Sequence, residues 1–112
     1  MSILSSKNAG VLILMPNGRL DTQSAPEADQ LITGAMEQGE TRILVDFGKT
    51  DYISSAGLRV LLKATKHLKQ AGGAFGLCNA NAQIREVLEI SGFATIMSCY
   101  RSLDEALGAM AV

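Results

Sequence analysis

One stretch of the sequence, residues 42–70, passes from a strand pattern through a short polar loop into a helix pattern. Residues 43–47 read Ile-Leu-Val-Asp-Phe, an apolar run of the length expected for a buried strand. Apolar residues recur at helical spacing over 58–68, with cations between them. A buried strand followed directly by an amphipathic helix indicates a layered α/β fold and places residues 51–57 at the strand-to-helix junction.

The composition sets limits on what such a chain does. Its 112 residues fit one domain, and 47% apolar residues are enough for a core. Ten basic against eleven acidic residues give a formal net charge of −1, which argues against a nucleic-acid-binding protein. Aromatic residues are only 4% of the chain, so a stacking platform for single strands is not expected.

Location and redox state are also indicated by the sequence. We find no leader-like segment at the start and no apolar run near the roughly 18 residues of a membrane span, so we expect a cytoplasmic protein that does not bind membranes. Cys78 and Cys99 have no metal-ligand spacing, and apolar or small neighbours flank both. We therefore expect two reduced, partly buried thiols and no metal site.

Along the chain, strand-like and helix-like segments alternate. Strands are predicted at 2–7, 11–15, 42–47, 74–78 and 93–97, with Pro16-Asn17-Gly18 ending or bending the second. One helix is predicted over about 56–70, and three others follow the capping residues Ser24, Asn81 and Ser102. Glu27 and Glu105 lie three residues after the two capping serines, as in a capping box. The order β-β-α-β-α-β-α-β-α predicts a single α/β domain with a largely parallel sheet.

Ser54 and Ser55 stand at the predicted start of the second helix. Serine is a favoured helix cap, so one of them needs no other role. Only one can be the cap, and the small neighbours Ala56 and Gly57 leave the other open to a partner. A phosphate on a hydroxyl there would be stabilised by the free N–H groups of the first turn. A glycine in a helix is about 1 kcal/mol less favourable than an alanine. That Gly57 nevertheless occupies the first turn suggests that another part of the backbone approaches closely at this position.

Enzymatic chemistry is poorly supported. The single histidine, His67, falls in the middle of a predicted helix, and the nucleophile-elbow and phosphate-loop motifs are missing. A serine without a nearby base is a better substrate than catalyst. Asp21 and Asp46 each lie near the end of a predicted strand. Binding sites form where the carboxyl ends of parallel strands meet at one edge of the sheet, so both aspartates could approach the serine loop. Aspartate also suits turns for local reasons, which is the alternative for both.

The exposed side of the helix over 56–70 is basic. Its cations are Arg59, Lys63, Lys66 and Lys69, with no acidic residue to balance them. Such a face is compatible with two interpretations: a solvated surface, or a surface that steers an acidic partner toward the serine loop.

Residues 42–62, RILVDFGKTDYISSAGLRVLL, resemble the core signature of the STAS domain family. Gly18-Arg19-Leu20-Asp21 resembles the G-x-L-D turn of the same family, and element order and length match a stand-alone member along nearly the whole chain. The resemblance implies that residues 1–112 form one STAS domain, a small mixed β-sheet packed with about four helices.

The same resemblance implies a function in partner switching. Stand-alone members are typically anti-sigma factor antagonists. The unphosphorylated protein binds an anti-sigma factor that is also a serine kinase and so releases a sigma factor; phosphorylation breaks the complex, and a PP2C-type phosphatase restores it. No catalysis and no cofactor are implied for the antagonist itself.

The family pattern also implies which residues act. The phosphorylated serine lies two residues before the signature glycine, which is Ser55 here; Ser54 stands where many members carry aspartate and is the alternative. Asp21 matches an aspartate that lies near the phosphoserine in relatives. The expected partner-binding residues are Asp21, Ser54, Ser55, Ala56, Gly57, Arg59 and Lys63.

Three hypotheses follow for the function. The first is an anti-sigma factor antagonist controlled by phosphorylation at Ser55. The second is a STAS interaction module of another signalling complex, which binds a partner without a phosphorylation cycle. The third is a small serine-dependent enzyme, against which the missing base and missing oxyanion motif count.

Overall fold

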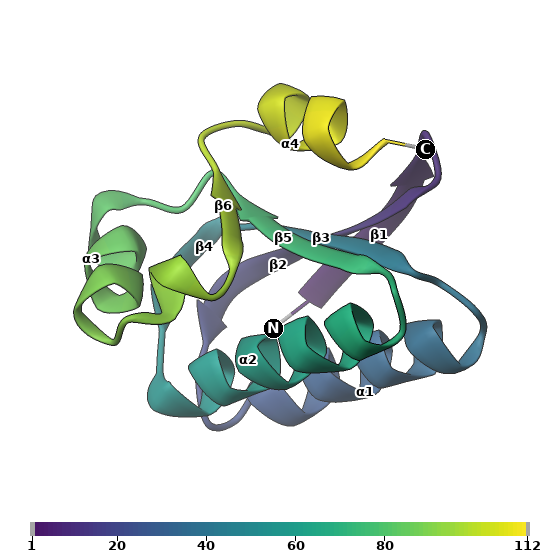
Figure 1. The fold of residues 1–112 in the computed structure, drawn as a ribbon. Coiled ribbons are helices and arrows are strands. Elements are labelled where there is room, and N and C mark those ends of the chain that lie inside the picture. The colour runs from purple at the N-terminus through teal and green to yellow at the C-terminus, as the bar shows by residue number, and fades with distance from the viewer. Residues whose placement is uncertain (1, 112) are drawn as a thin grey trace.

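The computed structural model describes residues 2–111, which form one α/β unit (Figure 1). Its strands are β1 (Ser2–Asn8), β2 (Val11–Leu20), β3 (Arg42–Asp46), β4 (Thr50–Ile53), β5 (Ala74–Cys78) and β6 (Ser98–Tyr100). Its helices are α1 (Ala25–Glu37), α2 (Ser55–Gln70), α3 (Ala82–Ile90) and α4 (Leu103–Met110), with a 3₁₀ turn, η1 (Phe93–Thr95). The predicted mixed sheet with about four helices is therefore confirmed over these residues.

The strands form one mixed sheet in the order β1-β2-β3-β5-β6. β1 is antiparallel to β2, and the other pairs are parallel. The first half of β2 pairs with β3, whereas its last residues pair with β4. The long strand β2 therefore carries the chain past the main sheet and brings Leu20 beside the end of β4.

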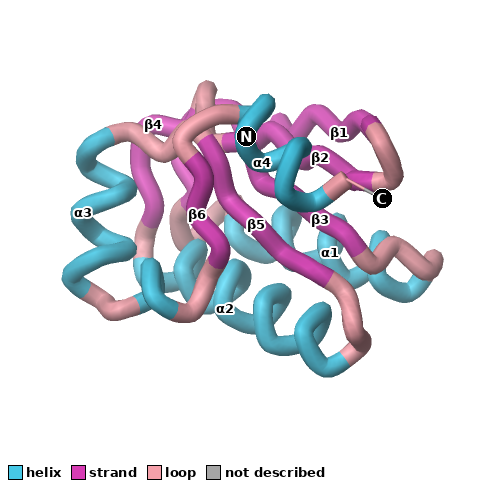
Figure 2. The backbone as a smooth tube through the Cα atoms, turned by 45° about the horizontal axis from the view of Figure 1, so that its top comes forward, coloured by secondary structure: helices cyan, strands magenta, loops and turns pink. Residues whose placement is uncertain are grey.

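Helices cover both faces of the sheet (Figure 2). α1 and α2 lie side by side on one face, and their buried residues share a core with β2, β3 and β5. α4 covers the other face through Ala106 and Met110, which pack with Val11, Ile13 and Leu44. The third helix, α3, lies at the end of the sheet near β4 and β6 (Figure 1).

Strand β4 is not predicted by the sequence. Residues 50–53 were read as part of the loop between a strand and the serine helix, because four residues that include Asp51 carry no period-two pattern. Their strand is set by tertiary pairing with β2, and the Thr50 hydroxyl donates to the Pro16 carbonyl at 2.8 Å. The strand that leads into the serines is thus β4 and not β3.

The structure decides between the two alternatives for the second strand and corrects the prediction for the last strand. Pro16-Asn17-Gly18 bends the second strand without ending it, because Gly18 takes φ +102° and the register with β4 shifts after it. Residues 93–97 were predicted as the last strand, but 93–95 form the turn η1, and the strand is Ser98–Tyr100. An apolar run without periodicity does not specify which of its residues pair with β5.

The predicted helix caps were correct at two positions of three. Asn81 accepts a hydrogen bond from Ile84 N at 2.8 Å, and Ser102 accepts one from Glu105 N at 3.1 Å. Ser24 precedes α1, but its hydroxyl makes no cap bond to that helix. It donates instead to the Arg19 carbonyl at 2.6 Å and accepts from Asp21 N, so it holds the turn before α1.

Candidate functional site

The two serines have different places at the junction of β4 and α2. Ser54 is the N-cap: its Oγ accepts from Gly57 N at 3.3 Å, and it is half-buried. Ser55 is the first residue of α2, and its side chain is exposed. The hydroxyl of Ser54 therefore belongs to the helix cap, whereas that of Ser55 is open to another molecule.

Close backbone packing holds this junction in place. Ser54 N donates to the Leu20 carbonyl at 2.9 Å, and a Cβ atom at Gly57 would lie 2.8 Å from the same oxygen. It would also lie 2.9 Å from Ile53 Cγ1. The close approach expected at Gly57 is confirmed, and it explains why a glycine occupies the first turn of α2.

Asp21 follows Leu20 directly and so enters the same region as the serines. Its carboxylate accepts from Gln23 N at 3.0 Å and from Ser24 N at 3.2 Å, and it lies 3.6 Å from Arg19 Nε. The bond from the Ser24 backbone is the main reason that the pKa of Asp21 is lowered. A carboxylate that stays ionised is thus fixed on the turn beside the β4–α2 junction.

Arg19 on β2 packs over the ring of Tyr52 on β4, close to Asp21. Arg19 and Tyr52 are register partners on β2 and β4, and the Arg19 guanidinium lies 4.3 Å from the centre of the Tyr52 ring. A cation over a tyrosine face is attracted by the ring. This contact orients Arg19 next to Asp21, which sequence reasoning did not foresee because β4 was not recognised.

A shallow groove runs between α1 and α2 beside the serines. α1 and the turn before it contribute Thr22, Pro26 and Asp29, and α2 contributes Ala56, Arg59, Val60 and Lys63. The α1 side of this groove was missed, since only the packing of the two helices brings it next to α2. A partner that approaches Ser55 would therefore meet residues of both helices.

The basic face of α2 is partly neutralised. Lys63 Nζ lies 3.1 Å from the Asp29 carboxylate on α1, so the expectation of unbalanced cations is wrong for Lys63. Arg59, Lys66 and Lys69 are exposed, and the ion pairs of residues 2–111 include none of the three. Arg59 lies four residues after Ser55, on the same side of the helix.

Asp46 and His67, the other titratable residues that the sequence raises as candidates, are not part of the site around Ser54 and Ser55. The Asp46 carboxylate is buried and accepts from Gly48 N at 2.8 Å and Asn79 Nδ2 at 3.0 Å, so it braces the loops after β3 and β5. His67 is twelve residues along α2 from Ser55, which corresponds to about 18 Å of helix. The described residues thus offer Ser55 no histidine base, and they hold no cluster of three metal-ligating side chains.

The cysteines also differ from one another. Cys78 is buried, whereas Cys99 is largely exposed. Partial burial still raises the pKa of the Cys99 thiol. Both thiols are free.

Of the helices in residues 2–111, none combines the length and the hydrophobicity that crossing a bilayer requires.

Known proteins resemble this chain in sequence and in structure. Residues 2–106 match the STAS domain family. The Bordetella bronchiseptica protein BtrV, provisionally named an anti-sigma factor antagonist, is 38% identical over 97% of this chain and 94% of its own length.

Solved structures share the fold. A Thermotoga maritima protein, also provisionally named an anti-sigma factor antagonist, superposes with a TM-score of 0.93 at 24% identity over 96% of this chain and 93% of its own. The anti-sigma factor antagonist SpoIIAA is known in an unphosphorylated form (TM-score 0.76, 18% identity, 96% of each chain). The Bacillus protein SpoIIAA in the phosphorylated form gives 0.75 at 22% identity over 96% of this chain and 98% of that one.

Proposed function

Because the chain belongs to the STAS domain family, we propose that it acts as an anti-sigma factor antagonist whose binding is switched at Ser55. In this proposal, the unphosphorylated protein binds an anti-sigma factor that is also a serine kinase, and a sigma factor is released. The kinase phosphorylates Ser55 and the complex dissociates, and a PP2C-type phosphatase returns the protein to its binding form. The names of the relatives support the antagonist function, and the cycle itself is our inference.

The exposed hydroxyl of Ser55 beside the capping hydroxyl of Ser54 is the observation that carries this proposal. A kinase needs a hydroxyl that projects into solvent and whose modification leaves the helix intact. Ser55 meets both conditions, whereas phosphorylation of Ser54 would remove the bond from Gly57 N. That SpoIIAA is known in phosphorylated and unphosphorylated forms supports a cycle of this kind in the family.

Electrostatics favour an effect on binding over an effect on folding. Phosphorylation adds about −1.5 to −2 charges. At a helix N-terminus such a charge is favourable by about 0.3–1 kcal/mol. An unpaired charge enclosed in an interface costs about 3–5 kcal/mol, which weakens binding by roughly 100- to 1000-fold or more. The interface cost is the larger of the two.

The surface around Ser55 supports a partner with acidic groups. Arg59 is exposed beside it and free of the ion pairs described above. Asp21 supplies one fixed carboxylate on the turn after β2. The proposed binding residues are Asp21, Ser54, Ser55, Ala56, Arg59 and Lys63. Gly57, which the sequence pattern also suggests for binding, is buried against Leu20 and instead holds the junction in place. Lys63 contributes at the cost of its pair with Asp29.

The test is a pull-down from the native cytosol with wild type, Ser55→Ala and Ser55→Asp as baits. We expect wild type and Ser55→Ala to retain an ATP-binding, kinase-like protein that Ser55→Asp does not retain. Ser6→Asp is the matched control, since it places the same charge on an exposed serine of β1. It should bind like wild type.

The same variants separate binding from folding. Ser55→Asp should melt within a few degrees of wild type, because the added charge lies at a helix N-terminus. A large fall in its Tm would contradict the proposed mechanism. Equal capture by all baits would instead favour the STAS interaction module without a phosphorylation cycle.

A further inference from the structure

A second cavity lies away from the serines, between α3 and the edge of the sheet at β6. It has a volume of about 400 Å³, within the range of small-molecule sites. Its floor is apolar: Leu77 of β5, Leu88 of α3, and Ala80 and Ala94 from the flanking segments. Leu77 and Leu88 are only 1% and 2% exposed, so these two side chains are packed in the core and only their edges line the cavity.

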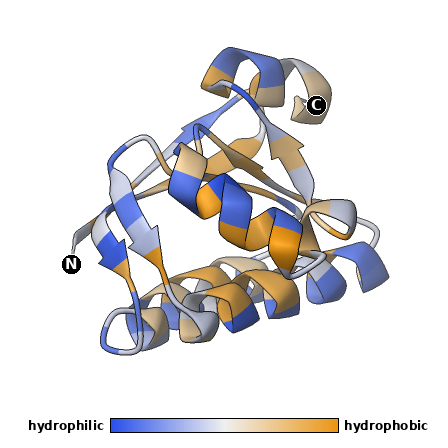
Figure 3. Cartoon of the chain, turned by 90° about the vertical axis from the view of Figure 1, so that its left-hand side faces the viewer, coloured by the Kyte–Doolittle hydropathy of each residue, from blue (hydrophilic) through white to orange (hydrophobic). Residues whose placement is uncertain are grey.

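The sheet edge beside this cavity is short. β6 has only three residues, and Cys99 on it is the register partner of Leu77. Residues 93–97, which could have extended that strand, form the turn η1 and the approach to β6. α3 carries both apolar and charged residues (Figure 3), and its Arg85, Leu88 and Glu89 line the cavity. The cavity lies beside this short strand, and Cys99 and Tyr100 of β6 line it.

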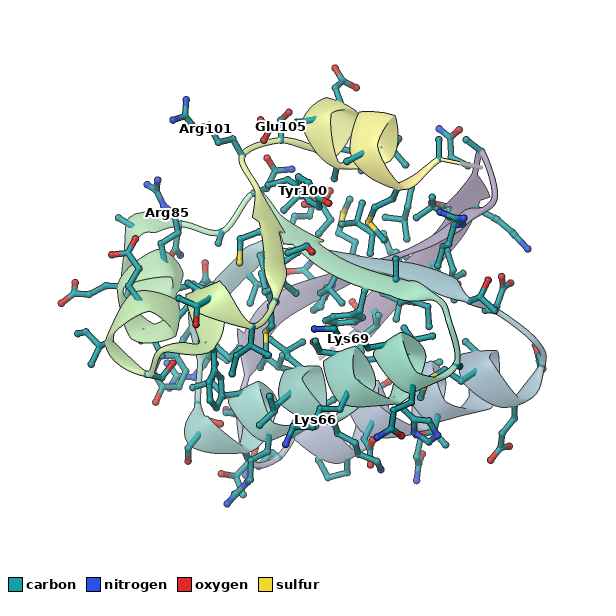
Figure 4. The ribbon with its side chains drawn as sticks, viewed as in Figure 1. Lys66, Lys69, Arg85, Tyr100, Arg101 and Glu105 are labelled. Atoms are coloured by element: carbon teal, nitrogen blue, oxygen red, sulfur yellow. The ribbon has the colours of Figure 1, made fainter. Side chains whose placement is uncertain are left out.

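Two arginines stand at the rim of the cavity. Arg85 extends from α3 and Arg101 follows β6, and both project from the corner of the molecule that is opposite to Lys66 on α2 (Figure 4). Both are exposed, and the ion pairs found in residues 2–111 involve neither. Glu89 is the single acidic residue that lines the cavity, so the lining has a formal charge of +1.

From this combination we propose that the α3–β6 cavity binds an amphipathic carboxylate of medium chain length. The apolar chain would lie against Ala80 and Ala94 and reach the edge of Leu88, and the carboxylate would pair with Arg85 and Arg101 at the rim. Burial of the chain supplies the hydrophobic free energy, and the planar guanidinium groups match a carboxylate. This site is separate from Ser55, and the inference does not depend on the proposed function.

The probe is sodium octanoate, titrated into ¹⁵N-labelled protein and followed by amide chemical shifts. We expect saturable shifts at Leu77, Ala80, Leu88 and Cys99. In Arg85→Gln/Arg101→Gln the affinity should fall about tenfold, as expected for the loss of two partly exposed ion pairs. The matched control is Lys66→Gln/Lys69→Gln, which removes the same charge from α2 and should bind octanoate like wild type.

Neutral 1-octanol distinguishes the charge contribution from simple burial in the cavity. The arginine substitutions should leave its affinity within about twofold, because a hydroxyl makes no ion pair with a guanidinium. Cys99 gives a second readout: octanoate should slow its alkylation by iodoacetamide, and Cys99→Ser identifies the reacting thiol, since Cys78 is buried. Equal octanoate affinity in wild type and the arginine variant, shifts confined to other surfaces, or no saturable shift would overturn the proposal.

Discussion

Ser54 and Ser55 are adjacent and chemically identical, yet they take different roles. The sequence shows that one of them caps α2. The backbone path from β4 into α2 decides which one, because Ser54 has extended dihedral angles (φ −96°, ψ 174°) and Ser55 is already helical. An N-cap residue turns its side chain back onto the first turn, whereas the next residue projects outward.

This difference predicts unequal effects of alanine. Ser54→Ala should lower the free energy of unfolding by about 1 kcal/mol, because Gly57 N loses its partner. Ser55→Ala should change it by less than about 0.5 kcal/mol, since the side chain is exposed and makes no cap bond. Urea unfolding of the two variants measures both values. Equal losses would mean that the cap is shared or wrongly assigned.

Gly57 gives a second prediction at the residue scale. In an open helix Gly→Ala is favourable by about 1 kcal/mol. At Gly57 the new methyl would lie 2.8 Å from the Leu20 carbonyl oxygen, and overpacking of this kind costs about 1–3 kcal/mol. Gly57→Ala should therefore destabilise the protein.

The control for Gly57 is Gly34→Ala in α1. Apart from its chain neighbours and the backbone of α1 itself, no atom lies within 4 Å of a Cβ there, so the substitution should raise the Tm. Opposite signs for the two variants in thermal unfolding would support the packing argument. A stabilising Gly57→Ala would show that Leu20 and β4 can move apart.

At the scale of elements, Asn81 links α3 to the strand that leads into the site. Its Oδ1 caps α3, while its Nδ2 donates to the Asp51 carbonyl at 3.2 Å and the Thr50 carbonyl at 3.4 Å. One side chain thus begins a helix and fixes that helix against β4. The position of β4 in turn sets where Ser54 and Ser55 begin α2.

We expect Asn81→Ala to cost more than the loss of an ordinary cap. Ser102→Ala, which removes a cap that serves only α4, should cost about 1 kcal/mol. Asn81→Ala should cost about 2 kcal/mol, because the cap and the bonds to β4 are lost together. Asn81→Ser keeps a cap oxygen without the amide and should fall between them. If all three lose the same stability in urea, the bonds to β4 contribute nothing.

At the scale of the whole molecule, Cys78 couples stability to alkaline pH. It lies in the core under α4, and burial, with a smaller contribution from Asp46, raises its pKa from 9.0 to about 12. Because the pKa of the Cys78 thiol is higher in the folded state, its contribution to the free energy of unfolding is complete below pH 9. The effect is lost as pH rises above 9, because the unfolded thiol ionises while the folded thiol keeps its proton.

We therefore expect the free energy of unfolding to fall faster above pH 9 in wild type than in Cys78→Ala. The difference in slope should reach at most about 1.4 kcal/mol per pH unit. The variant will be less stable at all pH values because it leaves a cavity, so the slopes and not the absolute values are compared. Parallel curves from pH 8 to 10.5 would contradict the assigned burial.

The sequence by itself determined what depends on neighbouring residues. Apolar runs predicted β2, β3 and β5, the helical repeat predicted α2, and the asparagine and serine caps predicted where α3 and α4 begin. The signature around Ser54, Ser55 and Gly57 indicated both the family and the junction of the site. These features are local, because they rest on spacing within one turn or one strand.

Tertiary structure alone decided the features that join distant segments. β4 exists because the end of β2 offers a pairing edge some thirty residues away, and β6 lies after η1 because β5 selects its register. The packing of α1 on α2 formed the groove beside Ser55 and paired Lys63 with Asp29, and α3 and β6 enclosed the second cavity. Pairing and packing depend on which surfaces meet, and a short segment carries no pattern for a partner far away in the chain.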